Sequence, residues 1–359
     1  MDHIKIIKRA FQITRVYRAL WIFGILLALT ASGGGGGSGN TGLRFDGSRN
    51  GEFPFFEGSQ IPWTWEEISA VVIPVGIALL CLGLLLAVAF TIVRYVSETA
   101  VVRMVDQFEK TEEKASFREG FRMGWSRPAW RLFLIDLLLG VTTVLVVILL
   151  GLIAAAPLLL WLTGSDTAGI LGTAVTVGFA LLFIFLGILA AIAVSVLVQF
   201  FRRACVLEDL GVFDSIRRGF ALVRKRLGDV AVMALILFGI GLGWFILMIP
   251  VYVLLALAGV LVGGLPGLGA GLLADLVAGG AWPWIVGFGI GLPIFLLVFG
   301  LPALFLNGLL KAFVSSSWTL TYRELLTMEN GDAAAGRSPG ELALPAPPSE
   351  PEESIPPEE

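Results

Sequence analysis

The stretch LFLIDLLLGVTTVLVVILLGLIAAAPLLLWL, residues 132–162, decides the class of fold. Its only charged residue is Asp136, and no polar periodicity interrupts it. A helix that crosses the hydrocarbon core of a bilayer needs about 20 consecutive apolar residues. This stretch is longer than that, so we expect it to form a membrane-spanning helix.

Apolar runs of the same kind lie on both sides of this stretch. We expect six spans, at residues 20–31, 68–93, 132–162, 170–201, 230–262 and 284–314. Composition agrees, because 57% of the residues are hydrophobic and 15% are charged, whereas soluble domains have about 25% charged residues. The sequence therefore predicts an all-α integral membrane protein with six transmembrane helices.

The first span is the shortest, and its nature has two interpretations. At about 1.5 Å per residue, a helix over 20–31 is shorter than the bilayer core of about 30 Å. Because basic residues precede it and small residues follow it, the segment also resembles a cleaved signal peptide. Leu29 opposes that alternative, since it occupies a position where cleavage after Ala31 requires a small residue. We therefore keep the segment as a span.

The distribution of basic residues predicts the orientation of the chain. Lys and Arg near span ends are retained on the cytoplasmic side during insertion. They gather before the first span and in segments 94–131 and 202–226, whereas segment 33–67 has only Arg44 and Arg49 among several acidic residues. We expect 33–67 to be a Gly-rich outer loop and both termini to be cytoplasmic. The abundance of Arg and Gly is typical of a bacterial chain, which would then lie in the inner membrane.

A basic amphipathic segment followed by two spans occurs three times. The segment SFREGFRMGWSRPAWRLF aligns with SIRRGFALVRKRLGDVAV and, more weakly, with IKRAFQITRVYRALWIF. A small residue followed by phenylalanine occupies the same place in each segment: Gly120-Phe121, Gly219-Phe220 and Ala10-Phe11. Apolar and charged side chains fall on opposite faces, which is typical of helices that lie flat on membranes. The sequence predicts three repeated units, each a basic amphipathic helix plus a two-span hairpin.

The arginines of these segments are candidate contacts for anionic lipid: Arg118, Arg122, Arg217 and Arg218. A basic residue near an anionic membrane surface contributes about 1 kcal/mol of attraction. The plainer alternative is that these charges only set the topology, because positive-inside sorting explains basic cytoplasmic loops in most multi-pass proteins.

The basic helices, the repeated Gly-Phe dipeptides and the segment SSSWTLTYRELL at 315–326 carry a family resemblance. They resemble a group of six-span bacterial membrane proteins similar to the membrane domain of glycerophosphoryl diester phosphodiesterases. The resemblance covers about residues 1–328 and implies a membrane domain over that range. Enzymatic members of the family carry a soluble barrel after this domain, whereas here an acidic, Pro-rich segment at 329–359 follows, which we expect to be a disordered cytoplasmic tail. No catalytic residue carries over.

Residues suited to catalysis or to metal binding are scarce. His3 is the only histidine, which excludes histidine-based metal sites and general bases within the bundle. We therefore expect no catalytic residue, no metal and no cofactor. The net charge of −3 and the lack of a nucleic-acid motif predict no nucleic-acid partner.

Three polar residues within the spans are candidate functional groups. Asp136 lies near the start of the third span, and its charge should be paired with Arg131 or with an arginine on another helix, because an unpaired charge in lipid is costly. Asn307 lies in the last span, and Lys311 follows one turn later. Asn307 either hydrogen-bonds to another helix or lines a polar cavity.

The last hairpin is rich in proline and glycine. Its prolines are Pro250, Pro266, Pro283, Pro293 and Pro302, and small-xxx-small pairs occur at Gly239 with Gly243 and at Gly287 with Gly291. We expect regular helix to be interrupted there. Close helix packing is one explanation, and a substrate site formed by discontinuous helices is the other.

Two functions are compatible with these features. The leading interpretation is a non-enzymatic membrane module that organises lipids, partner membrane proteins or further copies of itself through its basic helices. The alternative is a permease or lipid-translocating protein that uses the interrupted sixth span, with Asn307, Pro293 and Pro302 near its path.

Overall fold

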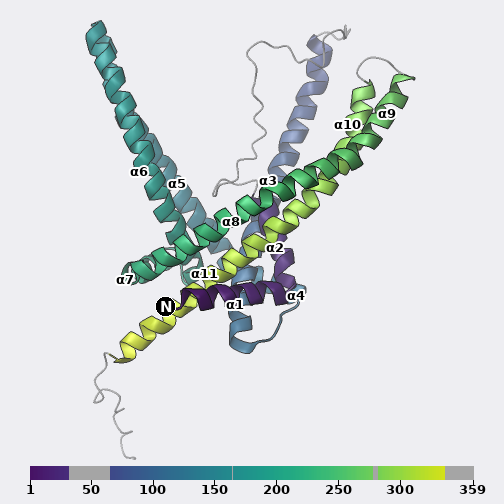
Figure 1. The fold of residues 1–359 in the computed structure, drawn as a ribbon. Helices are drawn as coiled ribbons and strands as arrows, with labels where there is room; N and C mark the ends of the chain where they lie inside the picture. Colours follow the sequence, from purple (N-terminus) through teal and green to yellow (C-terminus); the bar gives the residue numbers. More distant parts are fainter. Residues whose placement is uncertain (32–64, 164, 278–281, 336–359) are drawn as a thin grey trace, which may run out of the picture.

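The computed structural model describes residues 1–31, 65–163, 165–277 and 282–335, and these residues form helices joined by short turns (Figure 1). The α-helices are α1 (His3–Val16), α2 (Ala19–Ala31), α3 (Trp65–Thr111), α4 (Phe117–Gly124), α5 (Arg127–Ala155), α6 (Asp166–Leu207), α7 (Val212–Lys225), α8 (Leu227–Gly259), α9 (Leu265–Asp275), α10 (Trp282–Phe295) and α11 (Leu301–Ala335). A 3-10 helix, η1 (Ala156–Thr163), extends α5, and the π-helical turns η2 (Val260–Gly264) and η3 (Leu296–Gly300) join α8 to α9 and α10 to α11. No strand occurs within these ranges.

Five helical stretches are long and apolar enough to cross a membrane: Gly76–Thr111, Arg127–Leu162, Asp166–Leu207, Leu227–Asp275 and Trp282–Gly331. Helices α1 and α2 provide a sixth if the pair, which bends by 98°, is counted as one span. The fold therefore fits a multi-pass helical membrane protein, as the apolar runs of the sequence predict.

Several helices continue past the predicted ends of the spans. Helices α3, α6 and α11 run on beyond residues 93, 201 and 314 without a break. The beginning of α3 at Trp65 also makes residues 65–67 helical, although we expected them in the outer loop, and the rest of that loop lies outside the described residues. Apolar content marks where a helix is in lipid, but a helix can continue in water when its side chains pack against neighbours.

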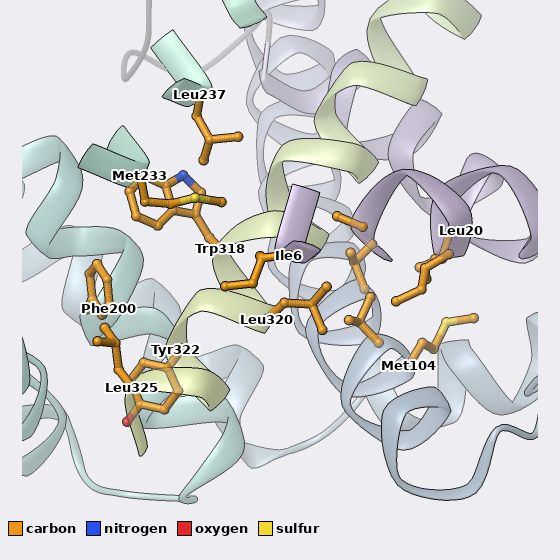
Figure 2. Close-up of a cluster of buried hydrophobic side chains, with 14 of the residues drawn as sticks. Ile6, Leu20, Met104, Phe200, Met233, Leu237, Trp318, Leu320, Tyr322 and Leu325 are labelled. Carbon is orange, nitrogen blue, oxygen red and sulfur yellow. The ribbon is translucent and has the colours of Figure 1, made fainter. Parts of the chain in front are cut away.

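The packed core lies where these extensions meet. It joins α1, α2, α3, α6, α7, α8 and α11 through buried side chains such as those labelled in Figure 2: Ile6, Leu20, Met104, Phe200, Met233, Leu237, Trp318, Leu320, Tyr322 and Leu325. Phe200 and Trp318 meet edge to face, with ring centroids 5.6 Å apart. By contrast, the most apolar windows of α3 and α6 contain no buried residue. The α5–α6 and α8–α11 hairpins diverge from this core (Figure 1), so most of their apolar surface is left for lipid.

Regular α-helix is interrupted in the last hairpin, as expected, by the π-helical turns Val260–Gly264 and Leu296–Gly300, but these turns do not break the last span into separate helices. Helix α10, the turn η3 and helix α11 follow one another as a continuous helical stretch, Trp282–Gly331. Pro293 lacks an N–H group, and the wide π-helical turn that begins at Leu296 adjusts the hydrogen bonding just after it. Prolines therefore modify this helix without ending it.

Glycines allow close helix packing at only one of the two predicted pairs. A Cβ atom at Gly287 would lie 3.0 Å from the carbonyl oxygen of Gly267, and one at Gly291 would lie 2.9 Å from that of Gly263. Helices α9 and α10 thus approach backbone to backbone. Gly239 and Gly243 have no atom within 4 Å of such a position and make no comparable contact.

Candidate functional site

Each basic short helix packs on the end of a span through its small residues. A Cβ atom at Gly120 of α4 would lie 2.5 Å from the sulfur of Met104, and one at Gly219 of α7 would lie 2.7 Å from the ring of Phe201. The matching Ala10 of α1 is completely buried. The small residue of the repeated dipeptide is therefore needed for close approach to the bundle. We expected these helices to lie flat on the membrane, but one face of each is used for packing.

The phenylalanine of the same dipeptide stays outside the packed core. Phe11, Phe121 and Phe220 are 58%, 45% and 49% exposed. Adjacent residues of a helix point in directions about 100° apart, so burial of the small residue turns the phenylalanine to the side. Each short helix thus presents an apolar ring outside its packed face, where a membrane interface can take it up.

A capping box fixes the beginning of α4. The Ser116 hydroxyl accepts a hydrogen bond from the Glu119 amide at 3.3 Å, and the Glu119 carboxylate accepts one from the Ser116 amide at 2.7 Å. The second bond, together with the serine hydroxyl, lowers the pKa of Glu119 below its usual value. This local arrangement positions the exposed arginines of the helix.

Three of the four predicted lipid-contact arginines are free to meet an anion. Arg118, Arg122 and Arg217 are exposed, and none of them forms an ion pair within the described part of the chain. Arg218 has a different place: its guanidinium lies 3.2 Å from the Glu208 carboxylate and 2.8 Å from that of Glu329. It therefore serves contacts within the protein.

Glu329 belongs to the segment predicted as a disordered tail. In the structure α11 continues to Ala335, and Glu329 also pairs with Lys225 at 2.6 Å. These ion pairs tie the end of α11 to α7, so the prediction is wrong for residues 329–335. The rest of the predicted tail lies outside the described residues.

Asp136 is paired with an arginine of another helix. Its carboxylate lies 2.7 Å from the Arg202 guanidinium of α6 and accepts a hydrogen bond from the Tyr95 hydroxyl at 2.9 Å. Arg131, the alternative partner, bonds instead to Asp209 at 3.0 Å. Asp136 therefore links α5 to α3 and α6.

The same arginine holds a second carboxylate that the sequence analysis did not single out. Arg202 lies 2.8 Å from Glu98 of α3, and Arg94 approaches Asp136 at 3.9 Å. We name Arg94, Glu98, Asp136 and Arg202 the ionic cluster. Their side chains are 11% to 19% exposed, so water screens these charges only partly. Acidic and basic residues near the ends of the apolar runs were the sequence signal for this cluster. The positive-inside rule alone explains the basic residues equally well, so the signal did not identify the pairs.

Asn307 and Lys311 lie in α11 in different surroundings. The Asn307 amide donates to the Tyr252 hydroxyl of α8 and to the carbonyl of Ala303, each at 2.9 Å. Asn307 therefore forms a hydrogen bond between helices, which is one of the two roles expected for it. Lys311 is exposed, and no carboxylate lies within 4.0 Å of it among the described residues. The described residues also include no group of three or more potential ligands close enough to hold a metal ion.

Taken together, the apolar helices, the packed core at their ends and the basic short helices fit a multi-pass helical membrane protein. The chain belongs to the family of unknown function DUF7544, which matches residues 4–322. Comparison with curated proteins and with solved structures gave no match. The family match includes all three basic short helices and the ionic cluster.

Substitution of Gly219 by alanine is expected to loosen α7. The added methyl group would meet the Phe201 ring at 2.7 Å and the backbone nitrogen of Phe201 at 3.1 Å, and the backbone cannot yield as a side chain can. Overpacking of this kind costs about 1–3 kcal/mol. Proteolysis of the α6–α7 connection in detergent should become faster than in the wild type.

Gly228 provides the matched control for this substitution. It lies at the start of α8 and has no atom within 4 Å of a Cβ position. Gly228→Ala should leave the rate of proteolysis unchanged, and equal rates for Gly219→Ala and the wild type would contradict the packing role of the repeated glycine.

Proposed function

We propose that the protein is a non-enzymatic membrane module that organises anionic lipids, and with them partner membrane proteins, through its basic short helices. The observation that supports this is the pairing of exposed arginines with exposed phenylalanines on helices fixed to the bundle. A basic helix with an apolar edge binds anionic membranes by charge attraction and by shallow insertion of its rings. Arg118, Arg122 and Arg217 supply the charge, and Phe121 and Phe220 the rings.

We further propose that α1, α4 and α7 are equivalent parts of three repeated units. Each is followed by a long or bent helix, as in the pairs α1–α2, α4–α5 and α7–α8. The repeated dipeptide has one buried small residue and one exposed phenylalanine in every case. This shared pattern of burial and exposure supports the repeat. The helices that follow differ in length and in bending.

The proposed setting is the inner membrane of a bacterium, with both termini in the cytoplasm. The basic segments support this orientation, because all three would then face the cytoplasmic leaflet with its anionic lipids. The resemblance to the membrane domain of glycerophosphoryl diester phosphodiesterases supports a domain that works beside enzymes or other proteins and has no catalysis of its own. A second copy of the chain is one such partner.

A permease or lipid-translocating function gains no specific support. The stretch Trp282–Gly331 stays helical through the π-helical turn at Leu296–Gly300, so it offers no specific support for a substrate site formed by separate broken helices. The amide of Asn307 already donates two hydrogen bonds, to Tyr252 and Ala303.

The proposal predicts that the triple variant Arg118→Gln, Arg122→Gln, Arg217→Gln loses most of its preference for anionic lipid. At about 1 kcal/mol for each residue, the change amounts to roughly 100-fold in relative affinity. Energy transfer from protein tryptophans to labelled phosphatidylglycerol in mixed nanodiscs measures the preference.

The triple Lys variant at the same positions is the matched control, because it keeps the charge. It should retain most of the preference. Equal enrichment of anionic lipid around the wild type and the Gln variant would contradict the proposal. Solute flux through reconstituted wild-type protein, abolished by Asn307→Ala, would instead favour the permease.

A further inference from the structure

A groove with a volume of about 760 Å³ runs along α3 to the beginning of α5. One end is formed by Leu84, Ala87 and Val88, in the apolar part of α3. The other end lies at the junction of α4 and α5, where Trp125, Arg127 and Trp130 line it. The groove is therefore apolar at the end within the membrane and cationic at the end where the spans begin.

The lining of the groove along α3 is apolar, because the one tyrosine in it directs its hydroxyl group to a partner outside the groove. Tyr95 lines the groove, but its hydroxyl donates to the carboxylate of Asp136 at 2.9 Å. Tyr95 as a whole is 8% exposed, and its ring is the part that is left to face an occupant. Thr91, also in the lining, donates its hydroxyl to the carbonyl of Ala87. An occupant of this part needs no polar groups of its own.

The cationic end is open and suited to a membrane interface. Trp125 and Trp130 are 62% and 64% exposed, and tryptophan prefers the level of lipid headgroups. Arg127 is exposed and has no ion pair in the described ranges. A long apolar groove that ends between two tryptophans and an arginine complements a molecule with a hydrocarbon chain and an anionic head.

We propose that this groove binds one phospholipid of the membrane leaflet that faces α4. An acyl chain lies along α3 between Leu84 and Val96, and the phosphate lies near Arg127 between the two tryptophans. The inference deepens the proposed function and rests on it, since it takes the protein to bind anionic lipid. It depends on other residues, however, because none of Arg118, Arg122 and Arg217 lines the groove.

The test is the amount of phospholipid that the purified protein retains, measured by native mass spectrometry after extraction in a mild detergent. The wild type is expected to retain one phospholipid. Ala87→Trp fills the apolar end and should abolish retention. Arg127→Gln should weaken retention of phosphatidylglycerol about fivefold, the effect of one basic residue near an anionic lipid.

Two variants serve as matched controls. Leu86→Trp places the same large side chain on α3 at a position that is 45% exposed and does not line the groove, and Arg224→Gln removes an exposed arginine of α7 that neither lines the groove nor is one of the three proposed lipid contacts. Both should retain lipid as the wild type does. Thermal unfolding of each variant confirms that loss of lipid is not loss of the fold.

The outcomes separate the groove from the surface helices. Retention by Ala87→Trp equal to the wild type would overturn the inference, as would displacement of the bound molecule by inorganic phosphate alone. Equal losses in Arg224→Gln and Arg127→Gln would overturn it too, while leaving the proposed function in place. Loss in the groove variants together with an unchanged anionic-lipid preference in the triple Gln variant would support the groove and reject the surface helices.

Discussion

Replacement of Arg202 by methionine is expected to lower the free energy of unfolding by about 3–5 kcal/mol, the range for removal of one partner from a buried ion pair. Arg202 lies 2.7 Å from the carboxylate of Asp136 and 2.8 Å from that of Glu98. Without it, the carboxylates of Glu98 and Asp136 lose the arginine that they share, and the next ion pair of Asp136 is the longer one to Arg94, at 3.9 Å. Unfolding in detergent mixed with increasing SDS measures the loss.

The controls distinguish charge pairing from the loss of a long side chain. Arg217→Met removes an exposed arginine of α7, and its effect should stay within about 0.5 kcal/mol. The triple variant Arg202→Met, Glu98→Leu, Asp136→Leu should regain most of the stability, because an apolar set of similar size often replaces a buried ion pair without loss. If Arg202→Met unfolds like the wild type, the ionic cluster does not stabilise the bundle.

The helical membrane class and five of the spans follow from apolar content alone. A run such as 132–162 can satisfy its backbone in lipid only as a helix, so the inference needs no knowledge of the neighbours. The ends of the helices were harder to predict. Beyond residue 314, α11 is held by side chains of other helices, such as Phe200 against Trp318, and these contacts are distant in the sequence.

The partners of charged residues were predictable only in kind. The position of Asp136 within an apolar run shows that it needs a cation, and an arginine on another helix was one of two expected solutions. The choice between Arg131 and Arg202 depends on how α5 and α6 cross, which local sequence does not encode. Arg218 illustrates the same limit, since Glu329 reaches it from a segment that composition assigned to a disordered tail.

The orientation of the short helices also depended on packing. The hydrophobic pattern places Phe117, Phe121 and Gly124 on one face, which we expected to lie on the membrane. In the structure Gly120 and Gly124 are buried, whereas Phe117 and Phe121 are more than 40% exposed. Small residues give little hydrophobic signal, yet they permit the closest approach between helices. The repeated glycine of the dipeptide was the feature that could have revealed this.

The same physics makes Gly24 the most sensitive position of the first span. Helix α2 packs on α11 where Gly24 meets Gly308: a Cβ atom at Gly24 would overlap the carbonyl oxygen of Gly308, and one at Gly308 would lie 2.7 Å from the backbone nitrogen of Ile25. Because both sides of the contact are backbone, Gly24→Val should destabilise the protein by about 3 kcal/mol, the upper part of the range for overpacking. SDS unfolding and protease access to the α1–α2 bend measure the effect.

A glycine without close neighbours is the control, because its substitution by alanine should raise the stability of the protein instead of lowering it. Gly83 on α3 has no atom within 4 Å of a Cβ position, and Gly83→Ala should stabilise its helix by about 0.5–1 kcal/mol through the higher helix propensity of alanine. Gly24→Ala gains the same propensity but must force α2 away from α11, so it should destabilise the protein. Stabilisation by both alanine variants would mean that α2 does not pack against α11 in the membrane.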